Sequence, residues 1–278
     1  MSRAARTARF TTQPRHPRDV RTRPLLGVSF SALDLIGHAF GPDSHEVQDA
    51  LARLDRTIKT LLDHLDRQVG RGRYVLALTS DHGVAPIPEQ VWAKGVDAGH
   101  LSAGAIRDAV ERALADYLGG GPHVAAVLGT EIYLNQGVWA QVAAHPPAWQ
   151  AVNAAVTAVP GVERMLHRGQ LTRTIDGDRL QRAAALSYFP GRSGDLVVIP
   201  RKHWVMTSDA TSHGTPHDYD QRAPLVLFGA GIRPGRYSEH VSPADIAPTL
   251  AALSRLPLAG ADGRTLARAL VLRAGSLQ

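Results

Sequence analysis

Apolar residues recur with two different periods along the chain, and the alternation between them predicts an α/β fold. Residues 25–30 (LLGVSF) form a short apolar run of the kind that makes a buried strand. A long helix is predicted next, because apolar residues then follow at steps of three and four: Val47, Leu51, Leu54, Ile58, Leu61, Leu62 and Leu65. Asp43 or Ser44 is the expected N-cap, and Gly70 marks the end of this helix.

A second buried strand is predicted at residues 74–78 (YVLAL). A strand, a helix and a strand within about 50 residues make a βαβ unit, which implies a parallel sheet with helices on its faces. The predicted architecture is therefore a three-layer α/β/α sandwich with a mostly parallel central sheet. In such sheets the chemistry gathers at the carboxyl ends of the strands, and both predicted strands are followed there by an aspartate and a histidine.

The middle of the chain is less regular, and residues 86–193 are interpreted as a lid inserted between core elements. Within it we expect helices at 102–118 and 149–159 and a strand at 130–134. The core is predicted to resume with strands at 196–199 and 225–228. A last helix is expected at 243–253, capped by Ser242.

Composition narrows the possible chemistry without changing this picture. The 278 residues are 44% hydrophobic and 20% charged, which is typical of globular proteins. The chain has no cysteine, which excludes disulfides, thiolate metal sites and thiol catalysis. No apolar run approaches the roughly 20 residues that cross a bilayer, so no membrane span is predicted. Any metal must be held by carboxylates and by some of the 13 histidines.

The sequence pI near 10 comes from one end of the chain. Residues 1–24 hold seven arginines and a single acid, Asp19, so this segment accounts for the whole net charge of +6. We expect residues 1–23 to be a disordered basic tail and residues 24–278 to be the folded domain. The remainder is balanced, so no nucleic acid is predicted as a specific partner. No apolar stretch of signal-peptide type follows the basic residues, and the localisation is left open.

Three short motifs carry the candidate chemistry. In the first, Asp34 and His38 are four residues apart and share one face if the backbone is helical. In the second, Asp81 and His82 follow an apolar strand and precede a glycine. The third is a Gly/Pro loop with His213 and His217 just before a predicted strand. Taken singly, each motif also fits a capping aspartate or a solvated histidine. Together they supply nitrogen and oxygen donors without a thiolate, which suits catalytic zinc.

The same blocks carry a family resemblance. The segments SFSALDLIGHAFGPDSHE, LTSDHG, SHGTPHDYDQRAPLVLFGAGI and SPADIAPTLAAL resemble, in this order, the alkaline phosphatase superfamily. They are most similar to its phosphatases and type I phosphodiesterases/nucleotide pyrophosphatases. The resemblance implies two zinc ions and a small phosphorylated substrate. By that resemblance Asp34, His38 and His213 hold one zinc as a full set, whereas Asp81 and His82 are a partial set for the second. His217 is expected near the site but not as a ligand.

The sequence departs from the family pattern at its start. The resemblance implies a further aspartate and a nucleophilic Thr or Ser upstream of the first motif, and no catalytic nucleophile is identifiable among residues 1–33. We therefore expect an N-terminally truncated member of the superfamily. The predicted function is zinc-dependent hydrolysis of phosphate monoesters or diesters. The alternative is a non-catalytic metal-binding or interaction protein that kept the scaffold, and the oligomeric state is left open.

Overall fold

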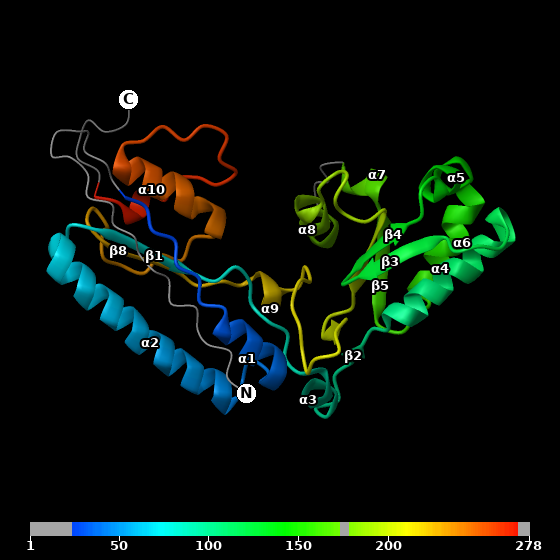
Figure 1. Ribbon diagram of the computed structural model, residues 1–278, viewed down its shortest axis with the longest axis horizontal. Helices are drawn as coiled ribbons and strands as arrows, with labels where there is room; N and C mark the ends of the chain where they lie inside the picture. Colours follow the sequence, from blue (N-terminus) through cyan, green and yellow to red (C-terminus); the bar gives the residue numbers. More distant parts are fainter. Residues whose placement is uncertain (1–23, 173–177, 272–278) are drawn as a thin grey trace.

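The computed structural model describes residues 24–172 and 178–271, which form two lobes joined by short connections (Figure 1). The first lobe, at the left of Figure 1, comprises α1 (Ala32–Phe40), α2 (His45–Leu65), β1 (Val75–Thr79), β8 (Leu225–Gly229) and α10 (Ile246–Ser254). The second lobe lies between β1 and β8 in the sequence. Its elements are α4 (Ala103–Leu118), β3 (Val124–Leu128), β4 (Glu131–Leu134), α5 (Val138–Ala144), α6 (Pro146–Thr157), β5 (Val162–His167), α7 (Arg168–Leu171), α8 (Arg179–Ser187) and β6 (Leu196–Pro200).

Short elements connect the lobes near the middle of the molecule. These are α3 (Pro88–Trp92), the parallel pair β2 (Gly99–His100) and β7 (Trp204–Val205), and α9 (Asp218–Gln221). A π-helical turn, η1 (Asp66–Gly70), extends α2, and the 3₁₀ turns η2 (Pro243–Asp245) and η3 (Ala267–Ala269) flank α10 in the sequence. The chain therefore passes between the lobes twice, each time through loops and short elements. No sheet of the described residues continues from one lobe into the other.

The second lobe has a hydrophobic core of its own. Its four strands pair antiparallel in the order β3-β4-β6-β5. Apolar side chains from α4 and α6 pack against this sheet, because each helix carries an apolar stripe at helical spacing. The buried cluster includes Ile106, Val110, Leu114, Ile132, Val152, Val156, Leu196 and Val198. This packing makes the second lobe the better-buried part of the molecule.

The first lobe is built on only two strands. β1 and β8 pair antiparallel, with Val75 opposite Gly229 and Thr79 opposite Leu225. The predicted helix after residue 43 is α2, and its cap is Ser44, whose hydroxyl accepts the Val47 amide at 3.2 Å. Despite its regular apolar stripe, α2 has no buried residue. Within the described residues, the buried apolar side chains of this lobe are few: Ala85, where the chain leaves the lobe, Ala269 and Leu270.

The α/β class predicted from the sequence is confirmed. The predicted helices correspond to α2, α4, α6 and η2–α10, and the predicted strands at 74–78, 130–134, 196–199 and 225–228 correspond to β1, β4, β6 and β8. No helix among the described residues is long and apolar enough to cross a membrane. The expected disordered tail, residues 1–23, lies outside the described residues.

Two predictions about the sheet are wrong in detail. Residues 25–30 form no strand, and Leu25 is 86% exposed, because the run finds no strand to pair with among the described residues. The expected parallel pairing is therefore replaced by the antiparallel pair of β1 with β8. Residues 196–199 do form a strand, but β6 pairs with β4 and β5 in the second lobe and does not return to β1. An apolar run favours a strand, but it does not determine which strand lies beside it.

The independent core of the second lobe gives a stability prediction. Leu114 is fully buried, so Leu114→Ala should leave a cavity and lower the free energy of unfolding by about 2–5 kcal/mol. Leu128, which is 63% exposed on β3 of the same lobe, is the matched control, and Leu128→Ala should stay within about 0.5 kcal/mol. Urea unfolding followed by circular dichroism measures both changes. Equal losses for the two variants would contradict this description of the core.

Candidate metal centre

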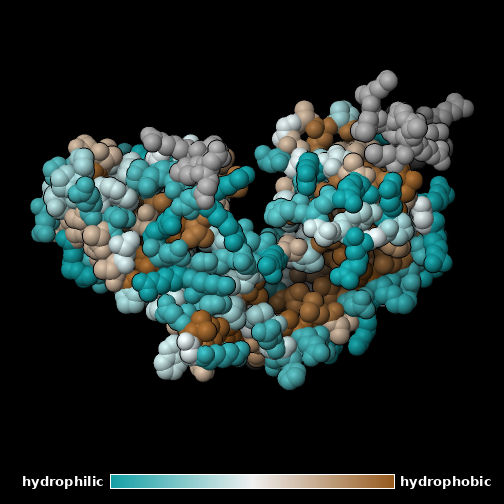
Figure 2. Space-filling model, turned by 180° about the vertical axis from the view of Figure 1, so that it is seen from behind, coloured by the Kyte–Doolittle hydropathy of each residue, from teal (hydrophilic) through white to brown (hydrophobic). Residues whose placement is uncertain are grey.

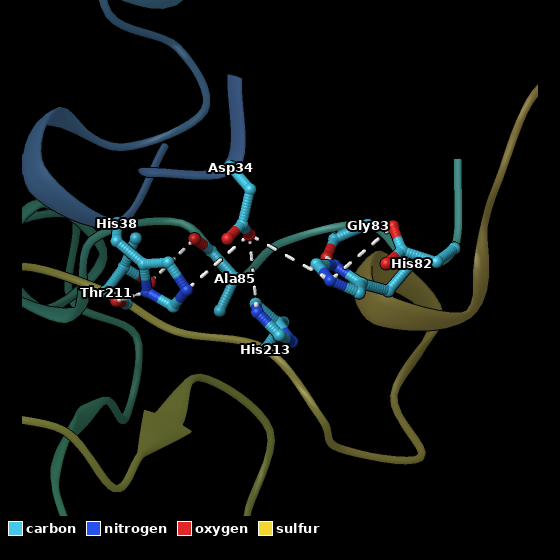
Figure 3. A network of polar contacts seen from close by, with 8 residues as sticks. Asp34, His38, His82, Gly83, Ala85, Thr211 and His213 are labelled. Carbon is cyan, nitrogen blue, oxygen red and sulfur yellow. Dashed lines mark hydrogen bonds and ion pairs between the residues drawn. The ribbon is translucent and has the colours of Figure 1, made fainter. Parts of the chain in front are cut away.

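The first two candidate ligands lie one turn apart on α1. Asp34 is in the first turn and His38 is in the last, so their side chains leave the same face of the helix. The distance between Asp34 Oδ1 and His38 Nε2 is 3.5 Å. The other ring nitrogen of His38, Nδ1, lies 2.9 Å from the backbone oxygen of Thr211 (Figure 3). Because a carbonyl can only accept, Nδ1 carries the proton and the lone pair of a neutral His38 is on Nε2.

Three imidazoles converge on the same carboxylate oxygen. His213 Nε2 lies 3.4 Å from Asp34 Oδ1, and His82 Nε2 lies 3.9 Å from it (Figure 3). The rings of His82 and His213 are stacked, with centroids 3.5 Å apart and planes inclined by 17°. His82 Nδ1 is 2.8 Å from the Gly83 carbonyl, which leaves its Nε2 as the acceptor in the neutral ring. Lone pairs that face a carboxylate repel it unless a proton or a metal ion lies between them.

Asp81 is the outermost of the predicted ligands. It lies two residues after the end of β1, its side chain is 90% exposed, and its Oδ1 is 3.7 Å from His82 Nε2. The structure therefore places Asp81 and His82 as an adjacent pair at the rim of the Asp34 cluster. Asp34 is itself 41% exposed, whereas His38, His82 and His213 are each exposed by about a quarter or less. The site is thus a shallow surface centre that a substrate can reach.

Backbone hydrogen bonds between two distant loops hold these groups in place. The Ala85 amide donates to the Ser212 carbonyl at 3.0 Å, and the Thr211 hydroxyl donates to the Ala85 carbonyl at 2.8 Å. The Thr211 amide also donates to the His38 carbonyl at 3.2 Å. Together these bonds tie α1, the segment after β1 and the loop of His213 into one unit. We call these contacts among His38, Ala85, Thr211 and Ser212 the loop clasp.

A buried carboxylate braces the same loop further along. Asp220 is 3% exposed, and its Oδ2 accepts both the amide of Thr215, at 2.7 Å, and its hydroxyl, at 2.5 Å. The Asp220 carbonyl accepts the Gly83 amide at 2.8 Å, which adds a second link to the segment after β1. A Cβ on Gly83 would lie 1.9 Å from the Tyr219 carbonyl oxygen, so only glycine allows this approach.

His217 plays a different part from the other histidines. It is 8% exposed, and its Nε2 hydrogen-bonds the Pro200 carbonyl of β6 at 2.8 Å. This bond connects the loop of His213 to the second lobe. His217 lies outside the group of residues whose donors converge, and its role near the site stays a prediction.

Burial affects two titrating groups of this region. It lowers the pKa of His213 from the ordinary histidine value, and the neighbouring imidazole of His82 lowers it further. Both effects favour the neutral ring, which is the form that binds a metal. Burial also raises the pKa of Asp220, against the opposing effect of the Thr215 hydrogen bonds.

The geometry of the innermost group fits a metal ion. One donor atom each from Asp34, His38 and His213 lies within 4.8 Å of the others, so these residues could hold an ion together. Two ligands at the usual zinc distances of about 2.0–2.1 Å and the tetrahedral angle are about 3.4 Å apart. The measured separations from Asp34 Oδ1 to His38 and His213 Nε2, 3.5 and 3.4 Å, match this value.

All five predicted site residues are therefore brought to one place, and three form the convergent group. Sequence reasoning missed Thr211, whose backbone oxygen orients His38, because any residue type offers a carbonyl. It also gave no role to Asp220 or Thr215. The residues on either side of Asp220, a tyrosine and a glutamine, give no sign that it is buried. The one available signal was its position a few residues before the apolar run of β8.

The family model for type I phosphodiesterase/nucleotide pyrophosphatase matches residues 2–222, most of the chain. The chain belongs to this family. Its relatives include alkaline phosphatases, which places it in the alkaline phosphatase superfamily as the sequence blocks predicted. Zymomonas mobilis alkaline phosphatase PhoD is 31% identical over 87% of this chain and 44% of its own length. A Myroides odoratus protein named calcium-transporting ATPase is 31% identical over 83% of this chain and 43% of its own length.

The structural comparison agrees with this assignment. The crystal structure of alkaline phosphatase PafA, a protein of Elizabethkingia meningoseptica, matches with a TM-score of 0.75 at 26% sequence identity. The match covers 86% of this chain and 46% of PafA. The chain therefore spans less than half the length of each of these three relatives.

The brace at Asp220 gives a pH-dependent prediction. An acid whose folded pKa is raised holds more protons when folded than when unfolded, so its contribution to stability falls as pH rises from the ordinary value of 3.8 through the folded pKa. Asp220→Asn removes this titration. The free energy of unfolding of the native chain minus that of the variant should therefore increase as the pH is lowered from about 7 towards 4.

Urea denaturation at a series of pH values measures this difference. Asp116→Asn, at an exposed position of α4, is the control and should give a difference that hardly changes. A difference for Asp220 that decreases on acidification would mean that its carboxylate is favoured by folding.

Proposed function

We propose that this chain provides the metal-binding part of a phosphoester hydrolase that acts on phosphate monoesters or diesters. Asp34, His38 and His213 hold one zinc ion, and Asp81 and His82 contribute to a second. The observation that carries the proposal is the convergence of three imidazoles on Asp34 Oδ1 at 3.4–3.9 Å. The family membership supports the reaction class, since relatives over most of the chain are named alkaline phosphatases.

The chemistry of the donors favours zinc. Imidazole nitrogen and carboxylate oxygen are typical ligands of catalytic zinc, and a set of three leaves a position open for a substrate or water. When bound, zinc acts as a Lewis acid that polarises a phosphoryl oxygen and lowers the pKa of a coordinated hydroxyl group. Asp34 is the only charged ligand in this set, since neutral His38 and His213 carry no charge. A bound zinc ion would therefore leave a net positive charge at the centre, which favours an anionic substrate.

Each protein group has a distinct task in this scheme. The Thr211 carbonyl fixes the tautomer of His38, so that the Nε2 lone pair points at the centre. The stacked ring of His82 holds His213 in its orientation and favours its neutral form. Asp81, at the exposed rim, places its carboxylate beside His82 without closing the approach to the site.

Metal binding is tested by zinc titration with stoichiometry measured by equilibrium dialysis. We expect about one tightly bound equivalent, and loss of at least about tenfold in affinity for Asp34→Asn or His213→Ala. Asp55→Asn and His64→Ala on the exposed side of α2 are the matched controls and should bind as the native chain does. Binding below half an equivalent, or equal affinity for all four variants, would reject the metal centre.

The substrate class is tested with a non-hydrolysable phosphoryl compound. Phenylphosphonate should bind the zinc-loaded chain, with heat detected by calorimetry, because an open zinc position attracts a dianionic phosphoryl group. The zinc-free chain and the zinc-treated His213→Ala variant should give no such heat. Binding that is independent of zinc would place phosphoryl recognition elsewhere in the chain.

A further inference from the structure

Apolar side chains are exposed over much of the first lobe, so exposure alone does not identify a binding site. In Figure 2, which views the molecule from behind, brown areas of this lobe, at the right, alternate with hydrophilic ones. A site for a small ligand is recognised instead by a concave surface that combines apolar side chains with a few charged or polar groups. A cavity beside β8 meets this description.

This cavity has a volume of about 630 Å³, which lies within the range of about 300–1,000 Å³ that is usual for pockets that hold small molecules. Three segments contribute to its lining: residues 225–227 of β8, the segment 232–241 and the segment 264–269. We call it the β8 cavity. Its lining includes none of the five candidate metal ligands, so the cavity is separate from the candidate metal centre.

Two arginines of the lining hold the walls of the β8 cavity together. The guanidinium of Arg264 donates to the backbone carbonyl of His240 at 2.9 Å. The guanidinium of Arg268 pairs with the carboxylate of Glu239. Both contacts join the segment that begins at residue 264 to the segment that ends at residue 241, so the shape of the cavity is fixed by the folded chain.

The other two arginines of the lining, Arg233 and Arg236, have a different status. Both are exposed, and within the described residues neither side chain has an ion-pair partner. Glu239 is the one acid of the lining, and its carboxylate is already paired with Arg268. Two guanidinium groups at this cavity are therefore available to an anionic group from outside the chain.

The rest of the lining is mainly apolar. Val226 lines the cavity from β8 and is 48% exposed. Ile232, Val241 and Leu266 add apolar side chains from the other two segments. An apolar group that enters the cavity would remove this surface from water, which is favourable. The cavity thus combines an apolar lining with cationic groups that have no partner.

We propose that the β8 cavity binds an amphipathic anion, that is, an apolar chain or ring that carries one acidic group. The apolar body lies against Val226 and Leu266, and the acidic group accepts hydrogen bonds from Arg233 and Arg236. A guanidinium group suits this task because its planar N–H donors match the two oxygens of a carboxylate. This inference is independent of the proposed function, because the cavity and the candidate metal centre share no residue.

The proposal is tested by isothermal titration calorimetry of the zinc-loaded full chain with dodecanoate, below the concentration at which micelles form. We expect about one bound equivalent, and affinity at least about tenfold lower for acetate, which lacks the apolar body, and for dodecylammonium, which has the opposite charge. The double variant Arg233→Ala with Arg236→Ala should bind dodecanoate at least about tenfold more weakly. The double variant Arg56→Ala with Arg71→Ala removes the same charge from exposed positions of this lobe outside the cavity and is the matched control.

Filling the cavity tests the apolar part of the proposal. Ala267 lines the β8 cavity, and Ala267→Trp should abolish dodecanoate binding while all four arginines remain. Ala252→Trp, at an exposed position of α10 outside the lining, is its control and should bind as the native chain does. The arginine variants keep the test valid if the larger side chain at position 267 prevents folding, which circular dichroism detects.

Three outcomes would overturn the proposal. Equal affinity of the two double arginine variants, or several equivalents bound to the native chain, would mean that dodecanoate binds to exposed apolar surface in general. Equal affinity for dodecanoate and dodecylammonium would remove the role of the arginines. Binding that disappears when zinc is removed with a chelator would place the anion at the metal centre, whereas unchanged binding in the zinc-free chain supports a separate site.

Discussion

The candidate site depends on one set of contacts, the loop clasp. Residues 38, 85 and 211 are far apart in the chain, and hydrogen bonds from backbone amides and from the side chains of His38 and Thr211 bring them together with the neighbouring residues His82 and His213. Each bond contributes about 1 kcal/mol net to the free energy of unfolding, because folding exchanges hydrogen bonds with water for it. Because the bonds share the same few residues, breaking one would move several ligands at once, and such sets act cooperatively.

The brace at Asp220 adds to the same restraint from the other side. Its buried carboxylate receives two hydrogen bonds from Thr215, while its backbone oxygen holds Gly83 next to His82. Burying a carboxylate is unfavourable, and the raised pKa of Asp220 reflects this cost. A buried carboxylate that lowers stability, yet is held by its hydrogen-bond partners, is typical of a site where the position of the surrounding residues serves function.

Local pattern predicted the elements well, since the apolar stripe of α2, the cap at Ser44 and the apolar runs of β1 and β8 are properties of adjacent residues. The candidate ligands were also identified from the sequence, because the three motifs together supply nitrogen and oxygen donors and carry the family resemblance. Pairing was not predictable to the same degree. Residues 25–30 and β6 have the composition of buried strands, but a partner strand is chosen by long-range packing that no short window contains. Orientation by backbone oxygens, as at Thr211, leaves no signature in residue type at all.

The two lobes are stabilised internally in different ways. The second lobe is stabilised by its own apolar cluster, whereas the first is a thin two-stranded sheet with helices that bury little. The candidate metal centre lies on this lobe, on α1 and in the segment after β1. Its geometry therefore relies on hydrogen bonds, and a bound ion would contribute to the stability of this lobe as well as to chemistry.

The chain leaves the first lobe at Ala85 and returns to it at Thr211, and the Thr211 hydroxyl donates to the Ala85 carbonyl at 2.8 Å. The second lobe is thus an insertion whose two ends lie next to each other. A segment of this kind can be replaced during evolution by one of different length or shape, since the entry and exit points stay where they are. The substrates that reach the candidate metal centre could then change in evolution through exchange of the second lobe, while the lobe that bears the candidate ligands is inherited unchanged.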